Sequence, residues 1–120
     1  MSLFSKKQGH NYEQRAADYL KSQGFQILAQ NFFCKGGELD LVAQKAQRLV
    51  FIEVKYRKSR NYGDPSEYVS ADKQQKLQRC AQVFLQKNPN YNSLEMRFDV
   101  MTFCGEETQP QWIENAFGGW

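Results

Sequence analysis

The spacing of apolar residues predicts two neighbouring strands in the middle of the chain. Residues 37–45 and 48–57 are each dense in apolar side chains, and only two residues separate them. Two such runs joined by a short connection are typical of a β-hairpin. Because Ala46 and Gln47 are weak turn formers, a longer connecting loop stays open.

The register of this hairpin brings two carboxylates together. A turn centred between the two strands places Asp40 opposite Glu53 and Glu38 opposite Lys55. Strand alternation puts Glu53 and Lys55 on the same face as Phe51. Like charges directly opposite each other destabilise a sheet, and buried charge is costly unless it is paired or binds metal. A divalent cation held by carboxylate oxygens would remove the conflict.

A first helix is predicted over residues 12–23, capped by Asn11 and ended by Gly24. Its apolar stripe consists of Ala16, Ala17 and Leu20. Glu13 falls on the same stripe, one turn earlier. An acid near a helix N-terminus is favourable because of the helix dipole, which is one explanation for Glu13. The other explanation is a role in a functional site, because Glu13 lies on the stripe that faces the core.

A second helix is predicted over residues 71–87, with Ser70 as its N-cap. Its apolar stripe consists of Leu77, Ala81, Phe84 and Leu85. Lys73 lies one turn before Leu77 on this stripe, so it points back towards the sheet.

Three further strands are predicted, over residues 25–33, 95–104 and 111–117, and residues 58–69 look irregular. In the second of these strands, alternation separates Phe98 and Val100 from Arg97 and Asp99, which form a structural or surface pair. The element order is α-β-β-β-α-β-β, an α/β class in which meander strands carry helices packed on the sheet.

The length of 120 residues predicts one domain, covering residues 1–120. The net charge of +3 is uneven, because seven basic and three acidic residues between positions 55 and 79 give that segment +4. Such a segment suits contact with a phosphate backbone, although an ordinary solvated surface has the same composition. The candidate nucleic-acid contacts are Arg57, Lys58, Arg60, Lys73 and Lys76.

The cysteines and the chain start bear on the cellular compartment. Cys34, Cys80 and Cys104 are scattered and odd in number, which predicts reduced thiols. His10 is the only histidine, so a zinc site is not expected, and we place His10 exposed before the first helix. Neither a membrane-spanning run nor a secretory signal is present, so the cytoplasm is the expected location, without membrane contact.

These residues suit metal-dependent phosphodiester hydrolysis. The reaction needs an activated water and neutralised phosphoryl oxygens, which Mg²⁺ or Mn²⁺ supplies when carboxylates hold it. Asp40, Glu53 and the carbonyl of Val54 are the candidate metal ligands. Lys55, charged beside two carboxylates, suits orienting the water and stabilising the phosphate better than removing a proton. Glu13 could hold a metal-bound water.

The order of these residues resembles the PD-(D/E)xK nuclease superfamily and, within it, the bacterial YraN-type family. The match rests on Glu13, residues 37–40 and 51–55, Lys73-Gln74, residues 97–100 and 115–117. The resemblance implies a restriction-endonuclease-like fold with a mixed central sheet flanked by helices. It also implies metal binding by Asp40 and Glu53, with Lys55 at the point of attack. Leu39 stands where the superfamily name has proline.

The resemblance extends to archaeal Holliday-junction resolvases, which have an acidic residue on the first helix where Glu13 stands. It implies an endonuclease that acts on DNA, including branched or damaged structures in repair or recombination, and leaves a 5′-phosphate. Related nucleases often dimerise, so a homodimer stays open.

Two other readings remain. The chain could be a nucleic-acid-binding module of the same fold that does not cleave. It could also be a structural or regulatory protein in which the acidic residues serve stability.

Overall fold

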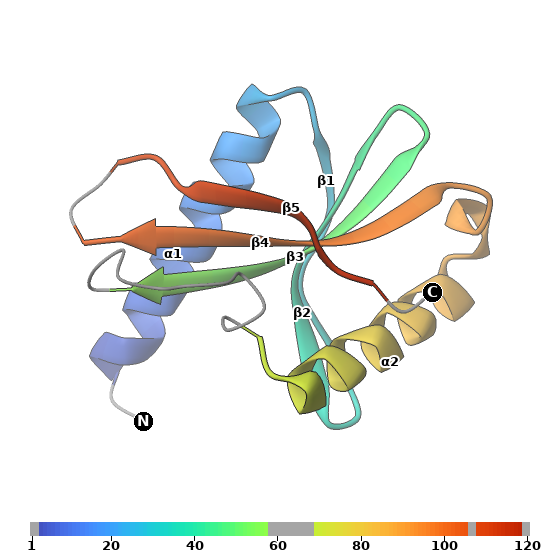
Figure 1. Ribbon diagram of the computed structural model, residues 1–120, viewed down its shortest axis with the longest axis horizontal. Coiled ribbons are helices and arrows are strands. Elements are labelled where there is room, and N and C mark those ends of the chain that lie inside the picture. The colour runs from blue at the N-terminus through green and yellow to red at the C-terminus, as the bar shows by residue number, and fades with distance from the viewer. Residues whose placement is uncertain (1–2, 58–68, 106–107, 119–120) are drawn as a thin grey trace.

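The computed structural model describes residues 3–57, 69–105 and 108–118, with side chains from residue 11 onward. The elements follow in the predicted order α-β-β-β-α-β-β (Figure 1). They are α1 (Leu3–Ser22), β1 (Gln26–Cys34), β2 (Gly37–Lys45), β3 (Arg48–Arg57), α2 (Ala71–Lys87), the 3₁₀ turn η2 (Pro89–Tyr91), β4 (Glu95–Cys104) and β5 (Gln111–Phe117). None of the helices in these ranges is long and apolar enough to cross a membrane.

The five strands form one mixed sheet in the order β1-β2-β3-β4-β5. Neighbouring strands are antiparallel except β3 and β4, which are parallel. Parallel neighbours need a crossover connection, and α2 lies in the connection between β3 and β4. This is the α/β, restriction-endonuclease-like arrangement expected from the sequence.

The sheet separates two apolar clusters, one under each helix. The α1 side consists of Ala16, Ala17, Leu20, Phe25, Leu41, Ala43, Val50, Ile52, Met101 and Phe103. The α2 side includes Leu39, Val42, Leu49, Phe51, Leu77, Ala81, Phe84, Phe98 and Val100. Because β3 contributes Val50 and Ile52 to one cluster and Phe51 to the other, its predicted alternation is confirmed.

The local predictions hold for most elements. The bounds of β2, β3, α2, β4 and β5 are those predicted, and β1 is displaced by one residue. Ser70 caps α2, accepting a hydrogen bond from the Lys73 N–H at 3.2 Å. The start of α1 was predicted wrongly: the helix begins at Leu3, so Asn11 is not its cap and His10 lies within it. Good helix formers at positions 6–8 extend it past the predicted cap.

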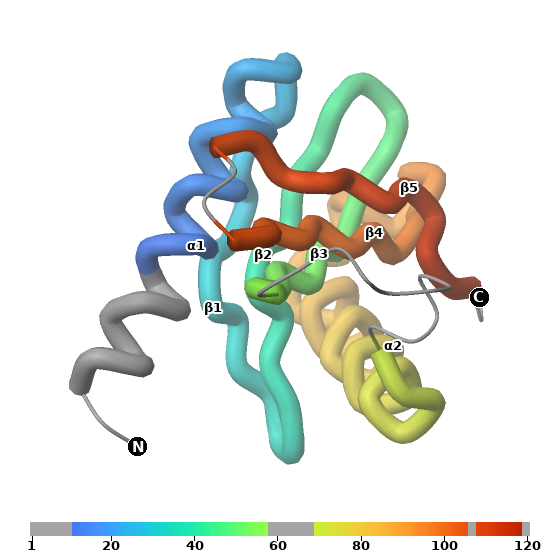
Figure 2. The backbone as a smooth tube through the Cα atoms, turned by 60° about the vertical axis from the view of Figure 1, so that its left-hand side comes forward, coloured from blue at the N-terminus to red at the C-terminus, as the bar shows by residue number. Residues whose placement is uncertain are grey.

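The strands β2 and β3 separate partway along their length. Their register runs from Lys45↔Arg48 to Leu41↔Ile52, as predicted, and stops there. Beyond this point β2 stays paired only with β1, and the two continue as a hairpin that extends away from the other strands (Figure 2). Asn31, which lies between ladder pairs of β1 opposite Asp40, has a φ of 55°. Asparagine tolerates this left-handed conformation. The separation of β2 from β3 leaves a fork between the two strands, with Asp40 at its apex.

A disulfide fastens the extended hairpin to α2. Cys34, at the end of β1, is bonded to Cys80 of α2, with the two Cα atoms 5.6 Å apart. A Cβ at Gly37 would lie 3.2 Å from the Cys80 sulfur, so the glycine makes room for the bridge. The prediction of three reduced thiols is therefore wrong for these two, while Cys104 is free and buried. Cys34 and Cys80 meet because α2 packs on the hairpin, and the spacing of cysteines along the sequence does not reveal this packing.

Reduction of this disulfide is expected to destabilise the fold. The bridge spans 46 residues, and constraining a loop of this length in the unfolded chain contributes about 2 to 4 kcal/mol. Urea unfolding with and without a thiol reductant measures the difference. The Cys34→Ser/Cys80→Ser double variant should be less stable by a similar amount and insensitive to reductant. An unchanged wild-type midpoint in reductant would mean that the bridge contributes nothing.

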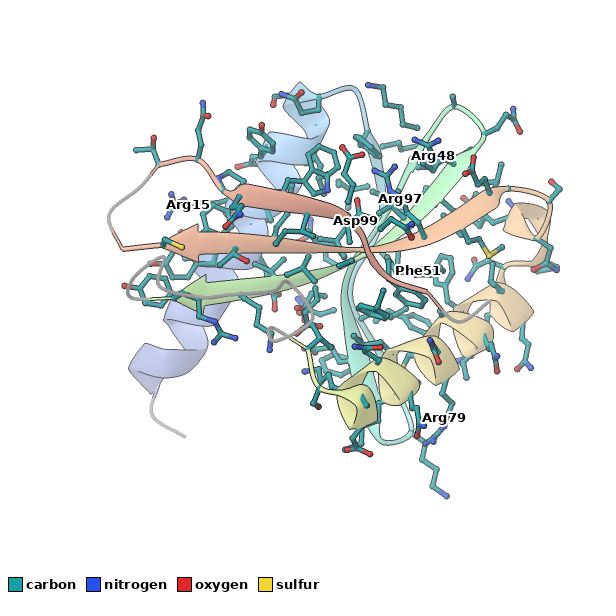
Figure 3. The ribbon with its side chains drawn as sticks, viewed as in Figure 1. Arg15, Arg48, Phe51, Arg79, Arg97 and Asp99 are labelled. Atoms are coloured by element: carbon teal, nitrogen blue, oxygen red, sulfur yellow. A yellow bond between two sulfur atoms is a disulfide. The ribbon has the colours of Figure 1, made fainter. Side chains whose placement is uncertain are left out.

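The last strand is anchored by Asp99, which is fully buried on β4. The side chains of Arg97 and Asp99 lie close together on this strand (Figure 3). The Asp99 carboxylate accepts hydrogen bonds from Arg97 Nε at 2.9 Å, Trp112 Nε1 at 2.7 Å and the Asn115 N–H at 2.8 Å. Burial raises the pKa of Asp99, and these hydrogen bonds oppose the shift. The predicted Arg97–Asp99 pair is thus a structural pair that fixes β5.

Truncation of Asp99 should destabilise the protein far more than truncation of its exposed neighbour. Asp99→Ala leaves the largely buried Arg97 guanidinium without its main partner, which costs about 3 to 5 kcal/mol. Glu114→Ala removes an exposed partner of Arg97 at 3.5 Å and should cost less than about 1 kcal/mol. Equal shifts in the urea midpoint for the two variants would contradict this role of Asp99.

Candidate metal-binding site

The apex of the fork is closed by a side chain rather than by the backbone ladder. Asp40 is 7% exposed, and its Oδ2 accepts a hydrogen bond from the Val54 N–H at 2.9 Å. Because the strands have already separated, Asp40 is not a ladder partner of Glu53, and Glu38 is not one of Lys55. The predicted pairing is corrected at these two positions. The carboxylate of Asp40 does, however, interact electrostatically with that of Glu53.

The second carboxylate lies on the α2 side of the fork. Glu53 is 6% exposed. Its Oε1 lies 3.4 Å from Lys73 Nζ of α2 and 3.8 Å from Lys55 Nζ. Its Oε2 is buried and has no hydrogen-bond partner in the described part of the chain. A buried carboxylate oxygen without a partner is costly, so this atom is suited to a ligand.

A third group of oxygens surrounds Asp40 on the α1 side. One carboxylate oxygen from each of Glu13, Glu38 and Asp40 lies within 4.8 Å of the other two, close enough to share a cation. Glu13 reaches this group from α1, as its place on the apolar stripe allowed. Glu38 is missing from the predicted site residues. Its spacing of two from Asp40, on one strand, was the signal that could have found it.

The carboxylates are electrostatically unfavourable as they stand. Burial, together with the charges of Glu53, Glu13 and Glu38, raises the pKa of Asp40 to about 8, although the hydrogen bond from the Val54 N–H opposes the shift. Burial also raises the pKa of Glu53, although Lys73 and Lys55 oppose the shift. Either a proton or a cation must offset this concentration of negative charge.

A cavity of about 190 Å³ opens beside these groups. It lies between the hairpin and the start of α2 and is lined by Gly36, Gly37, Glu38, Asp40, Lys73, Lys76 and Leu77. Lys76 pairs with Asp72 at 3.3 Å on the exposed side of α2. The cavity therefore has carboxylates on one wall and two lysines on the other.

The structure brings most of the predicted site residues together. Glu13, Asp40, Glu53, Lys55 and Lys73 meet at the fork. The N–H of Val54 faces Asp40, and because the N–H and C=O of one strand residue point to the same edge, its carbonyl faces the fork too.

The remaining predicted basic residues lie farther along the chain. Arg57 is the last residue of β3, two positions after Lys55 and on the same face. Its backbone carbonyl accepts a hydrogen bond from the Gly105 N–H at 2.8 Å. Lys58 and Arg60 lie outside the described residues.

The fold and this group of carboxylates define a restriction-endonuclease-like α/β protein with a candidate metal-binding site. The chain belongs to the uncharacterised protein family UPF0102, whose model matches residues 12–103, and the predicted YraN-type family is thereby confirmed. A UPF0102 protein of Vibrio parahaemolyticus is 43% identical over 117 residues, which cover 97% of each chain. A UPF0102 protein of Pseudomonas fluorescens is 40% identical over 109 residues, 91% of each chain, and one of Saccharophagus degradans is 45% identical over the same coverage.

The pKa of Asp40 predicts how stability depends on pH. Because the folded protein without metal holds this proton more tightly than the unfolded chain, its stability should fall as the pH rises from about 4 to about 8. The slope is at most about 1.4 kcal/mol per pH unit for each such group. Asp40→Asn keeps an oxygen for the Val54 N–H but never ionises. Its stability should therefore depend less on pH, and at pH 8 it should unfold at a higher temperature than the wild type.

Thermal unfolding in chelator between pH 5 and pH 8.5 measures both effects. Asp18→Asn is the matched control because Asp18 is an exposed aspartate on α1, bonded only to Gln14 among the described contacts. It should behave as the wild type does. A wild-type stability that rises across this range would contradict the assignment.

Proposed function

We propose that this protein is a Mg²⁺-dependent endonuclease that hydrolyses phosphodiester bonds in DNA. One observation carries the proposal: the nearly buried carboxylates of Asp40 and Glu53 interact with each other, Glu53 lies 3.8 Å from Lys55, and its second oxygen has no hydrogen-bond partner among the described residues. A core without a ligand gains nothing from this arrangement. The resemblance to the PD-(D/E)xK superfamily points the same way.

The donors at the fork fit magnesium. Mg²⁺ prefers oxygen ligands and keeps several waters, so a few carboxylates are enough to hold it. Asp40, Glu53 and the carbonyl of Val54 would hold the ion, and Mn²⁺, which favours the same donors, would substitute. When bound, the ion supplies an activated water and neutralises charge on the phosphoryl oxygens.

The protein's own side chains act on the phosphate and the water. The ammonium of Lys55 lies beside Glu53, where it stabilises the negative charge that develops on the phosphate and orients the attacking water. Lys73 lies 3.4 Å from the same carboxylate and would contact the scissile phosphate or its neighbour. Glu13, next to Asp40 on the α1 side, would accept a hydrogen bond from a metal-bound water.

The charge of the surrounding segment supports a nucleic-acid substrate. Residues 55–79 carry a net +4, and Lys55, Lys73 and Lys76 of this segment lie at the site. Phosphate contacts of this kind act on any sequence, and each one makes binding more sensitive to salt. We therefore propose that the protein recognises DNA through its phosphate backbone, without sequence specificity.

Cleavage of labelled linear, flapped, four-way and single-stranded DNA tests this function. The wild type should cut in Mg²⁺ or Mn²⁺ and not in chelator. Asp40→Ala, Glu53→Ala and Lys55→Ala should each reduce the rate by roughly 100-fold or more. Asp18→Ala, an exposed carboxylate on the same helix as Glu13, is the matched control and should cut normally.

Two results would count against this function. Cleavage that survives in Asp40→Ala would point to a contaminating nuclease. DNA binding that persists without any metal-dependent cleavage would make the protein a non-catalytic binding module of the same fold.

A further inference from the structure

Two large hydrophobic side chains are exposed in the described part of the chain, and both lie next to the acidic group. Phe33 on β1 is 70% exposed, and Tyr56 on β3 is 37% exposed. An exposed aromatic ring offers a large, flat apolar face that a ligand can cover.

Phe33 stands directly across the hairpin from a carboxylate of the site. In the antiparallel register Phe33 pairs with Glu38, and directly opposed residues project on the same face with Cβ atoms roughly 5 Å apart. Its neighbour Phe32 points to the other side, where its ring packs edge-on against Phe84 of α2 at a centroid distance of 5.4 Å. Phe33 therefore projects on the α1 side of the hairpin, beside Glu38.

Tyr56 approaches the same acidic group through Tyr12 of α1. It follows Lys55 on β3 and stacks on Tyr12 of α1, with ring centroids 4.9 Å apart and planes inclined by 15°. Tyr12 immediately precedes Glu13, which shares the acidic group with Glu38 and Asp40. Phe33 therefore adjoins Glu38, the Tyr12–Tyr56 stack adjoins Glu13 along the chain, and both aromatic groups lie on the α1 side of the sheet.

The lysines are on the other side of the fork. Lys73 and Lys76 line the cavity from α2, and Lys55 lies on the face of Glu53. A nucleotide strand has a charged backbone and planar, uncharged bases. A strand whose scissile phosphate enters the fork meets cations from the α2 side and flat apolar rings from the α1 side.

Base stacking requires bases whose faces are free. In a continuous duplex each base is already stacked between its neighbours, so exposed aromatic rings gain nothing from it. In single-stranded segments the bases can be splayed and stacked on aromatic side chains, which contributes to affinity without regard to sequence.

We propose that Phe33 and the Tyr12–Tyr56 stack bind unpaired bases on either side of the scissile phosphate, so that the substrate is DNA with a single-stranded segment. This inference rests on the proposed nuclease function for the position of the phosphate. The aromatic platforms themselves are tested by binding alone.

Fluorescence anisotropy with labelled oligo-dT and a labelled hairpin duplex of equal charge tests the proposal, in Ca²⁺ to suppress turnover. Phe33→Ala and Tyr56→Ala should each raise the Kd for oligo-dT about 5-fold or more and leave the Kd for the duplex unchanged. Phe33→Trp should restore affinity because it restores a ring, and its fluorescence should be quenched by oligo-dT. Phe33→Leu, which is apolar but not planar, should not. Gln30→Ala, at an exposed position of the same strand, is the matched control.

The outcomes separate this inference from the function on which it rests. Equal affinity of wild type and Phe33→Ala for oligo-dT overturns the stacking role, even where metal-dependent cleavage is present. Selective loss of oligo-dT binding in a protein that never cleaves supports stacking and overturns only the nuclease. The proposal also fails if Phe33→Leu binds oligo-dT as tightly as the wild type does, or if Phe33→Ala changes only the molar mass in light scattering. In those cases Phe33 is an apolar contact between two copies of the chain at the edge strand β1.

Discussion

The hydrogen bond from the Val54 N–H to the carboxylate of Asp40 is the interaction on which the site depends. Where β2 turns away from β3, an N–H of the inner strand loses its backbone acceptor, and a buried N–H without a partner is costly. Asp40 supplies the acceptor from its side chain. The side chain therefore closes the fork at its apex, and a carboxylate is held at a position that a backbone carbonyl would otherwise occupy.

The use of Asp40 as an acceptor places a carboxylate in a nearly buried position, where its charge must be offset by a proton or a cation. Glu53 lies on the neighbouring strand, Glu13 and Glu38 approach from the other side, and burial raises the pKa of both Asp40 and Glu53. Near neutral pH the site is poised between holding a proton and holding a cation. Natural sequences break local rules of this kind mainly at functional sites, where the loss of stability is tolerated.

Most of the elements follow from local patterns. Alternation within residues 48–57 assigned Phe51 and Glu53 to one face because a strand has a fixed period of two, and Ser70 marked the start of α2 because its hydroxyl caps an N–H. The point where two paired strands separate has no local signature, so the sequence predicted Asp40 opposite Glu53 when the ladder had already ended. The Cys34–Cys80 bridge is equally non-local, since α2 must pack before the two sulfurs meet.

The two sides of the sheet offer different side chains at the fork. The crossover from β3 to β4 brings the first turns of α2, with Lys73 and Lys76, over one opening of the fork. The other opening faces α1, which offers Glu13 and the ring of Tyr12, and the extended hairpin adds Phe33 and Glu38. Because the two strands separate at this point, lysines lie beside Glu53 on one side of the sheet, and flat rings lie next to Glu38 and Glu13 on the other. A nucleic-acid strand, with phosphates along one edge and bases along the other, has the matching asymmetry.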